Sequence, residues 1–146
     1  MSNKFVEKSI EINAPVSNVW RVFTDPALTR QMGGEYLSDW KVGSSFSWKG
    51  TDGQILTHGT ILKVEPEKLL QHNLINPDAP TVESLVSVIT YEFHEQGGLT
   101  TILGREDFSH PINDEEYSAA MDGWEAALQS VKEIAEKNTF MKKKNQ

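Results

Sequence analysis

The stretch Ala14-Pro15-Val16-Ser17-Asn18-Val19-Trp20 decides the fold that we predict for this chain. It follows a segment over Lys4–Asn13 in which apolar and polar residues alternate as in a β-strand. Pro15 suits the first position of a helix, because its missing N–H has no intrahelical partner to lose there. The valines and the tryptophan that follow recur at helical spacing. We therefore expect one strand that leads directly into a helix over Val16–Thr24.

A second short helix is predicted over Ala27–Met32, and Gly33-Gly34 ends it, since glycine readily adopts the conformation found at helix C-termini. Extended segments joined by turn residues fill the chain from there to about residue 108. We predict strands over Tyr36–Val42, Ser45–Lys49, Gln54–Glu65, Lys68–Ile75, Thr81–His94 and Leu99–Phe108. Strands joined by short turns are antiparallel neighbours, so the sequence predicts one meandering sheet.

A long helix over Glu115–Lys137, capped by Asn113 or Asp114, follows the last strand. One face of it is broadly apolar, which is typical of a helix that packs on a core. The apolar positions are Tyr117, Ala120, Met121, Trp124, Leu128, Val131, Ile134 and Ala135. At about 1.5 Å per residue such a helix is long enough to cross a sheet.

The order of these elements predicts an α+β helix-grip fold. In this fold a curved antiparallel sheet of six or seven strands wraps around the long C-terminal helix, with two short helices after the first strand. We expect one domain over residues 1–138 and a polar, Lys-rich tail over residues 139–146. A chain of 146 residues is long enough to bury a substantial core.

The composition excludes several classes of function. The net charge of −7 argues against a nucleic-acid surface, which needs clustered Lys and Arg. The chain has no cysteine, which excludes thiolate metal sites and thiol nucleophiles. We see no secretory signal, no membrane span, no metal-ligand spacing and no cofactor motif, and we expect a cytoplasmic protein.

Short motifs spread over nearly the whole chain resemble one known family. They are Ala14-Pro15 through Val19-Trp20, Thr24-Asp25-Pro26, Ser38-Asp39-Trp40-Lys41-Val42-Gly43 with Phe46 and Trp48, Asp52-Gly53, Gly59-Thr60 through Val64 with Pro66, Thr90-Tyr91-Glu92-Phe93, and Gly123-Trp124. In this order they resemble the single-domain homologues of the activator of heat-shock-protein-ninety ATPase. That family belongs to the START-related, birch-pollen-allergen-like superfamily. The resemblance implies a helix-grip fold and, from the family's name, a chaperone partner and a role in the stress response.

We predict a ligand cavity between the sheet and the long helix. Its expected lining combines large apolar side chains with two polar ones, as in many small-molecule sites. The candidates are Trp48, His58, Tyr91, Phe93, Glu106, Met121 and Trp124. His58 is assigned to the interior because its strand face is otherwise apolar, and Asn76–Val82 and Gly33-Gly34 are the expected rims.

Three functions are compatible with these residues. The first is a non-enzymatic module that binds a small hydrophobic molecule, and the second is an interaction domain that stimulates a chaperone ATPase. The third is a cyclase or hydrolase in which His58 and Glu106 form an acid–base pair. The third requires that these two side chains lie within hydrogen-bond reach, and we favour the first.

Overall fold

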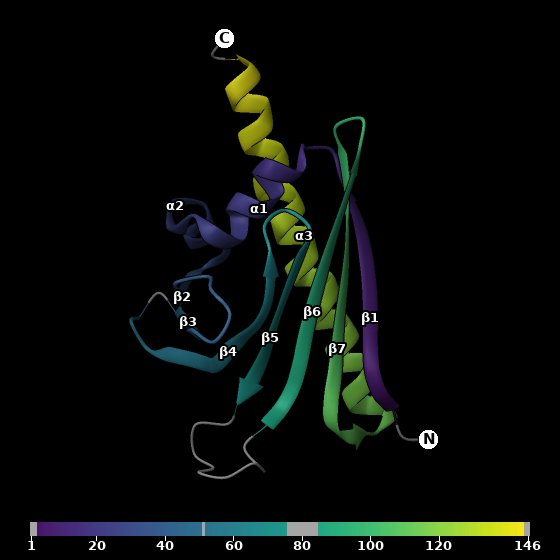
Figure 1. Cartoon of the computed structure of the whole chain (residues 1–146). Coiled ribbons are helices and arrows are strands. Elements are labelled where there is room, and N and C mark those ends of the chain that lie inside the picture. The colour runs from purple at the N-terminus through teal and green to yellow at the C-terminus, as the bar shows by residue number, and fades with distance from the viewer. Residues whose placement is uncertain (1–2, 51, 76–84, 145–146) are drawn as a thin grey trace.

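The computed structural model describes residues 3–50, 52–75 and 85–144 of the chain. Seven strands, three α-helices and one short 3-10 helix, η1, follow one another in these residues (Figure 1). In chain order they are β1 (Asn3–Ile12), α1 (Val16–Thr24), α2 (Pro26–Thr29), η1 (Arg30–Met32), β2 (Gly34–Ser38), β3 (Ser45–Gly50), β4 (Ile55–Glu65), β5 (Leu69–Ile75), β6 (Leu85–Gln96), β7 (Leu99–Ile112) and α3 (Asp114–Lys144). The predicted α+β class is confirmed.

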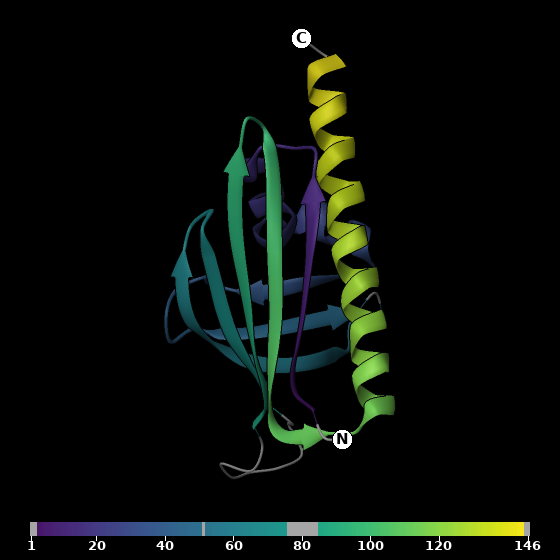
Figure 2. The same cartoon turned by 90° about the vertical axis from the view of Figure 1, so that its right-hand side faces the viewer.

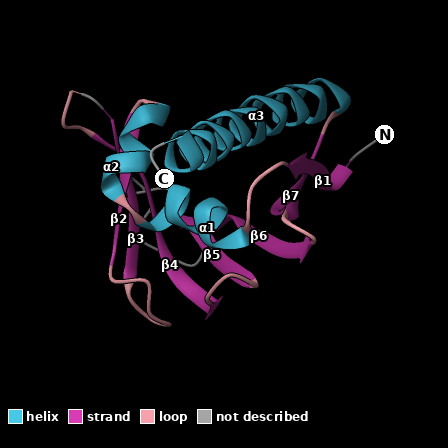
Figure 3. Ribbon diagram, turned by 90° about the horizontal axis from the view of Figure 1, so that it is seen from above, coloured by secondary structure: helices cyan, strands magenta, loops and turns pink. Residues whose placement is uncertain are grey.

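All seven strands form one antiparallel sheet in the order β1-β7-β6-β5-β4-β3-β2. Strands β2 to β7 meander, as their short connections predict. Strand β1 pairs with β7 instead of β2, so the first two strands lie at opposite edges of the sheet. The helical segment α1-α2-η1 makes the crossing between these edges, as Figure 3 shows from above.

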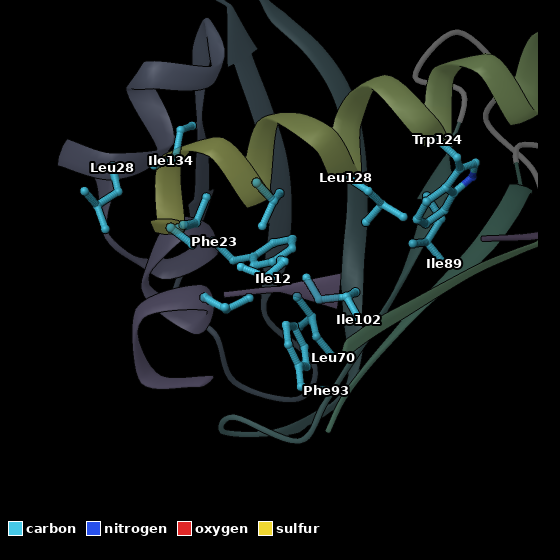
Figure 4. Packing of buried hydrophobic residues seen from close by; sticks show 14 of the residues in the cluster. Ile12, Phe23, Leu28, Leu70, Ile89, Phe93, Ile102, Trp124, Leu128 and Ile134 are labelled. Atoms are coloured by element: carbon cyan, nitrogen blue, oxygen red, sulfur yellow. The ribbon is translucent and has the colours of Figure 1, made fainter. Parts of the chain in front are cut away.

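Helix α3 lies on the concave side of the sheet and packs mainly against β1 and α1 (Figure 2). The strands from β6 to β2 curve away from it. Figure 4 shows apolar side chains of α3, α1 and the sheet meeting between these layers. Leu128 and Val131 are almost fully buried there, and Trp124 is 7% exposed. The predicted apolar face of the long helix is therefore confirmed.

The ends of the helices follow local rules. Asn113 and Glu116 cap α3 reciprocally, since each side chain accepts a hydrogen bond from the other residue's backbone N–H, at 2.8 and 3.2 Å. Gly33 ends the first helical segment with φ of 95°. Pro15 precedes α1 as its N-cap residue instead of occupying the first helical position, because its ψ of 152° is extended.

Helix α3 continues to Lys144, beyond the predicted end at Lys137. The sequence after Trp124 contains no Gly or Pro that would end it. Thr139, which we assigned to the tail, is helical and accepts a 2.6 Å hydrogen bond from the Asn18 side chain of α1. The division into a domain and a tail otherwise stays a prediction.

Strand β4 departs from the alternation that we assumed for it. Its register with β5 shifts between Ile61 and Lys63, which marks a β-bulge. As a result Ile61 is fully buried, and Val64, on the other side of the bulge, also packs against the core. Before the bulge the buried positions are Gly59 and Ile61, so the face that holds His58, which we assigned to the interior, is the outer face.

Candidate functional site

Two adjoining chambers lie between α3 and the curved sheet. The first, which we call the aromatic chamber, has a volume of about 280 Å³ and is lined by Met32, Tyr36, Phe46, Trp48, His72, Leu74, Ile89, Tyr91 and Ala127. The second, the Glu106 chamber, has about 320 Å³ and is lined by Ile89, Tyr91, Glu106, Ala120, Gly123, Trp124 and Ala127. They share three lining residues, so together they form one sheet–helix cavity.

The walls of the aromatic chamber come from paired strands. Tyr36 of β2 pairs with Trp48 of β3, and their ring centroids are 4.8 Å apart. Phe46 lies two residues before Trp48 on the same face, and its ring centroid is 5.1 Å from that of Tyr36. On its other side Phe46 stacks on His72 of β5 at 4.0 Å. Alternation along β2, β3 and β5 thus gathers these rings on the concave face, although β4 lies between β3 and β5.

His72 is a buried, neutral imidazole in the wall of this chamber. Burial lowers the pKa of His72 to about 4, which the hydrogen bond with the backbone of Asn73 only partly offsets. The Nδ1 atom lies 3.0 Å from the carbonyl oxygen of Asn73. Since a carbonyl oxygen only accepts, Nδ1 donates, and Nε2 of the neutral ring is an acceptor.

Two buried phenols connect the chambers. The phenol groups of Tyr36 and Tyr91 lie close enough to influence each other's pKa. Burial raises the pKa of Tyr36 to about 12 and the pKa of Tyr91 well above its usual value. The neighbouring Tyr36 and the negative charge of Glu106 raise the pKa of Tyr91 further. Both phenols are therefore neutral near pH 7 and can donate to a ligand or accept from it.

Glu106 points into the cavity from β7, the strand next to the edge strand β1. Its cross-strand neighbours are Val6 and Ile89, both buried, so its side chain lies on the core face. The carboxylate accepts hydrogen bonds of 2.7 Å from the Ser87 hydroxyl and 3.0 Å from the Trp124 indole N–H. These bonds join β7 to β6 and to α3, and they hold the carboxylate beside the opening.

The position of Trp124 depends on a glycine in the sheet. A Cβ atom on Gly104 would lie 2.2 Å from the Trp124 ring, so only glycine leaves room for it on β7. The ring centroid also lies 5.5 Å from that of Tyr91. Figure 4 shows Trp124 beside Ile89, with Leu128 further along the same face of α3.

The structure brings together four of the seven predicted site residues: Trp48, Tyr91, Glu106 and Trp124. Phe93 is 4% exposed and lies in the packed core, with its ring centroid 5.3 Å from that of Trp20. Met121 also packs against the core cluster. The predicted rim Asn76–Val82 lies outside the described residues.

The assignment of His58 to the interior is wrong. His58 is exposed, and its partners across the sheet, Ser47 and Ile75, lie on the outer face. The physical reason is the bulge in β4: we expected His58 and Val64 to share one face of an unbroken strand, but the bulge between them puts them on opposite faces. The proposed acid–base pair is therefore not assembled, because His58 and Glu106 lie on opposite faces of the sheet.

The sequence analysis missed His72 and Tyr36 as site residues. His72 alternates with Leu70 and Leu74 in β5, and that pattern alone would have placed it on the core face. The alternation around Tyr36 indicated its face of the sheet less clearly, because β2 is short. Its position became evident only from its pairing with Trp48.

The described residues contain no group of three or more His, Asp or Glu side chains arranged to hold a metal ion. None of the helices in the described part of the chain combines the length and the apolar character that a membrane crossing requires.

The fold defines a helix-grip protein with two open pockets between α3 and the sheet. The family model of the "Activator of Hsp90 ATPase homolog 1-like protein" matches residues 13–136, and the chain belongs to this family. No curated protein matches the chain significantly.

Solved structures share the fold at low sequence identity. MLL2253 from Mesorhizobium loti is 21% identical with a TM-score of 0.75, over 92% of this chain and 98% of that one. ChR145 from Cytophaga hutchinsonii is 24% identical with a TM-score of 0.76, over 94% and 97%. DynU16, a protein of the dynemicin biosynthetic locus, is 18% identical with a TM-score of 0.76, over 94% of this chain and 49% of that one.

Proposed function

We propose that this chain binds a small, largely apolar molecule in the sheet–helix cavity and does so without catalysing a reaction on it. The observation that carries the proposal is the pair of adjoining chambers, of about 280 and 320 Å³. Ligand sites typically measure about 300–1,000 Å³ and combine apolar walls with a few placed polar groups. The two chambers have this composition, and their joint size suits a ligand of a few fused rings or a medium alkyl chain.

The polar groups of the cavity support binding more than catalysis. Tyr36, Tyr91 and His72 are neutral near pH 7, and Glu106 is engaged by Ser87 and Trp124. A general acid–base pair needs a second titrating group close to the first. With His58 on the outer face, the pair that we had considered is not available.

A single substitution at the opening tests the proposal. Ala127 is exposed on α3 yet lines both chambers, so Ala127→Trp should fill the opening without disturbing the core. Ala126→Trp is the matched control, because Ala126 is equally exposed and lies outside these linings. The probe is the neutral fluorophore N-phenyl-1-naphthylamine, whose emission rises in apolar sites.

We expect saturable binding of one probe to the wild type and to Ala126→Trp, and at least tenfold weaker binding to Ala127→Trp. Native mass spectrometry of gently purified protein should show a bound mass that Ala127→Trp lacks. Lack of saturable binding by the wild type, or equal binding by all three proteins, would overturn the proposal. Circular dichroism of the variants checks that their folds are unchanged.

The family's name supports a second candidate function, stimulation of a chaperone ATPase. This proposal predicts that the chain accelerates ATP hydrolysis by a chaperone of the Hsp90 class at saturating concentration. An unchanged rate would remove it. Ala127→Trp separates the two candidates, since it should abolish probe binding and leave stimulation through an outer surface intact. A cytoplasmic location stays a prediction from the sequence.

A further inference from the structure

The charge inside the sheet–helix cavity is one-sided. Among the described residues that line the two chambers, Glu106 is the one with an acidic side chain, and no Lys or Arg is present. His72, the other ionisable base in these walls, is neutral there and presents Nε2 as an acceptor. A ligand that carried a carboxylate or a phosphate would therefore bring a second negative charge to a partly desolvated carboxylate without a compensating cation.

The Glu106 carboxylate retains capacity to accept from a ligand. Each oxygen has two lone pairs, and each accepts one protein hydrogen bond, from Ser87 or from Trp124. Both bonds also fix the carboxylate in position, so a ligand group meets a preorganised acceptor. Glu106 itself lines the second chamber, on the side of the exposed Gly123 and Ala127.

The rings around Glu106 favour a cation as well. Tyr91 and Trp124 flank the same chamber with centroids 5.5 Å apart. The faces of tyrosine and tryptophan attract ammonium groups, most strongly where water is excluded. The raised pKa of Tyr91, to which the charge of Glu106 contributes, is consistent with a negative potential at this place.

We infer that the ligand is a lipophilic amine, whose ammonium group binds Glu106 between Tyr91 and Trp124 and whose apolar body occupies the aromatic chamber. The inference rests on the proposed function and adds the chemical class of the ligand. The ammonium group adds a Coulomb attraction to the Glu106 carboxylate, which a neutral alcohol of the same shape lacks, and this gives the amine its preference. A carboxylate of that shape should bind least.

Three matched probes test this inference on the wild-type chain at pH 7. They are 2-naphthylmethylamine, 2-naphthalenemethanol and 2-naphthoate, which share one apolar body and differ in charge. Dissociation constants are measured by isothermal titration calorimetry, and the indole N–H resonance of Trp124 is followed by NMR. We expect the amine to bind at least tenfold more tightly than the alcohol, and to shift the Trp124 resonance.

Two neutralising substitutions complete the experiment. Glu106→Gln keeps the shape and removes the charge, so it should reduce amine affinity about tenfold and reduce the affinity of the alcohol much less. Asp107→Asn is the control, because Asp107 is the next carboxylate in the chain but pairs with Arg105 on the outer face. It should leave the preference unchanged.

The outcomes separate the inference from the proposal beneath it. If none of the probes binds the wild type, the proposal that the cavity binds a ligand is wrong. If the alcohol or the naphthoate binds as tightly as the amine, or if Glu106→Gln keeps the preference, the amine class is wrong and the cavity remains a binding site. The comparison of the three probes on the wild-type chain tests the amine class even if Glu106→Gln does not fold.

Discussion

The indole N–H of Trp124 donates a 3.0 Å hydrogen bond to the carboxylate of Glu106 and so ties α3 to β7 beside the cavity. Trp124→Phe keeps an aromatic ring there but leaves one oxygen of Glu106 without this donor. An unsatisfied polar group in a partly buried site costs about 1–3 kcal/mol, and we expect this loss in the free energy of unfolding. Urea denaturation followed by far-UV circular dichroism measures it.

A double-mutant cycle with Glu106→Ala, which removes the acceptor, isolates this bond from the loss of ring area. If the bond stabilises the fold, the effects of the two substitutions are not additive, with a coupling of about 0.5–3 kcal/mol. Additive effects would show that Trp124 acts through packing alone.

Acid should destabilise the fold through His72. Its folded-state pKa of about 4 lies below the unfolded value of 6.5, so the unfolded chain binds the extra proton between these values. The stabilisation is complete above the unfolded pKa and is lost as the pH falls toward 4. From pH 7 to pH 5 this linkage removes about 2 kcal/mol.

The variant His72→Phe keeps a ring against Phe46 and removes the titration. Urea denaturation at pH 7 and pH 5 should show a smaller loss of stability in the variant than in the wild type. Equal losses would mean that His72 titrates normally in the folded chain. Because only the difference between the two proteins is used, the other titrating groups cancel.

Two glycines beside Trp124 should respond to alanine in opposite ways. Gly104→Ala forces a Cβ to within 2.2 Å of the indole ring, and overpacking of this kind typically costs about 1–3 kcal/mol. Gly123 in α3 has open space at its Cβ position, so Gly123→Ala should add about 0.5–1 kcal/mol through helix propensity. Thermal unfolding of both variants checks this pair, and a stable Gly104→Ala would show that Trp124 can move.

The start of α1 is capped by a residue from the far end of β6. The backbone N–H of Val16 donates a 2.7 Å hydrogen bond to the Glu95 carboxylate, which also lies at the positive end of the helix dipole. Glu95→Ala should lower the free energy of unfolding by about 0.5–2 kcal/mol, as loss of a cap does. Glu95→Gln retains a hydrogen-bond acceptor, so it should lose less stability than Glu95→Ala. An equal loss in the two variants would mean that the negative charge of Glu95, and not the hydrogen bond, stabilises the start of α1.

Local sequence determined most of the elements of this protein. The spacing of Val16, Val19 and Trp20 predicts α1 with its observed bounds, since a helix of this kind is set by its own periodicity. The apolar face of α3 and its cap at Asn113 are likewise local. From these elements the helix-grip arrangement could be predicted, because a long amphipathic helix and a half-buried sheet must cover each other.

Only the tertiary structure decided on which face of the sheet His58 lies. A bulge in β4 shifts the register with β5, and a shift of one residue turns every side chain to the opposite face, so His58 points outward. The position of the Trp124 ring likewise depends on Gly104, which lies in β7 and not in α3. Register and close approach arise from pairing between distant parts of the chain, and no local pattern encodes them.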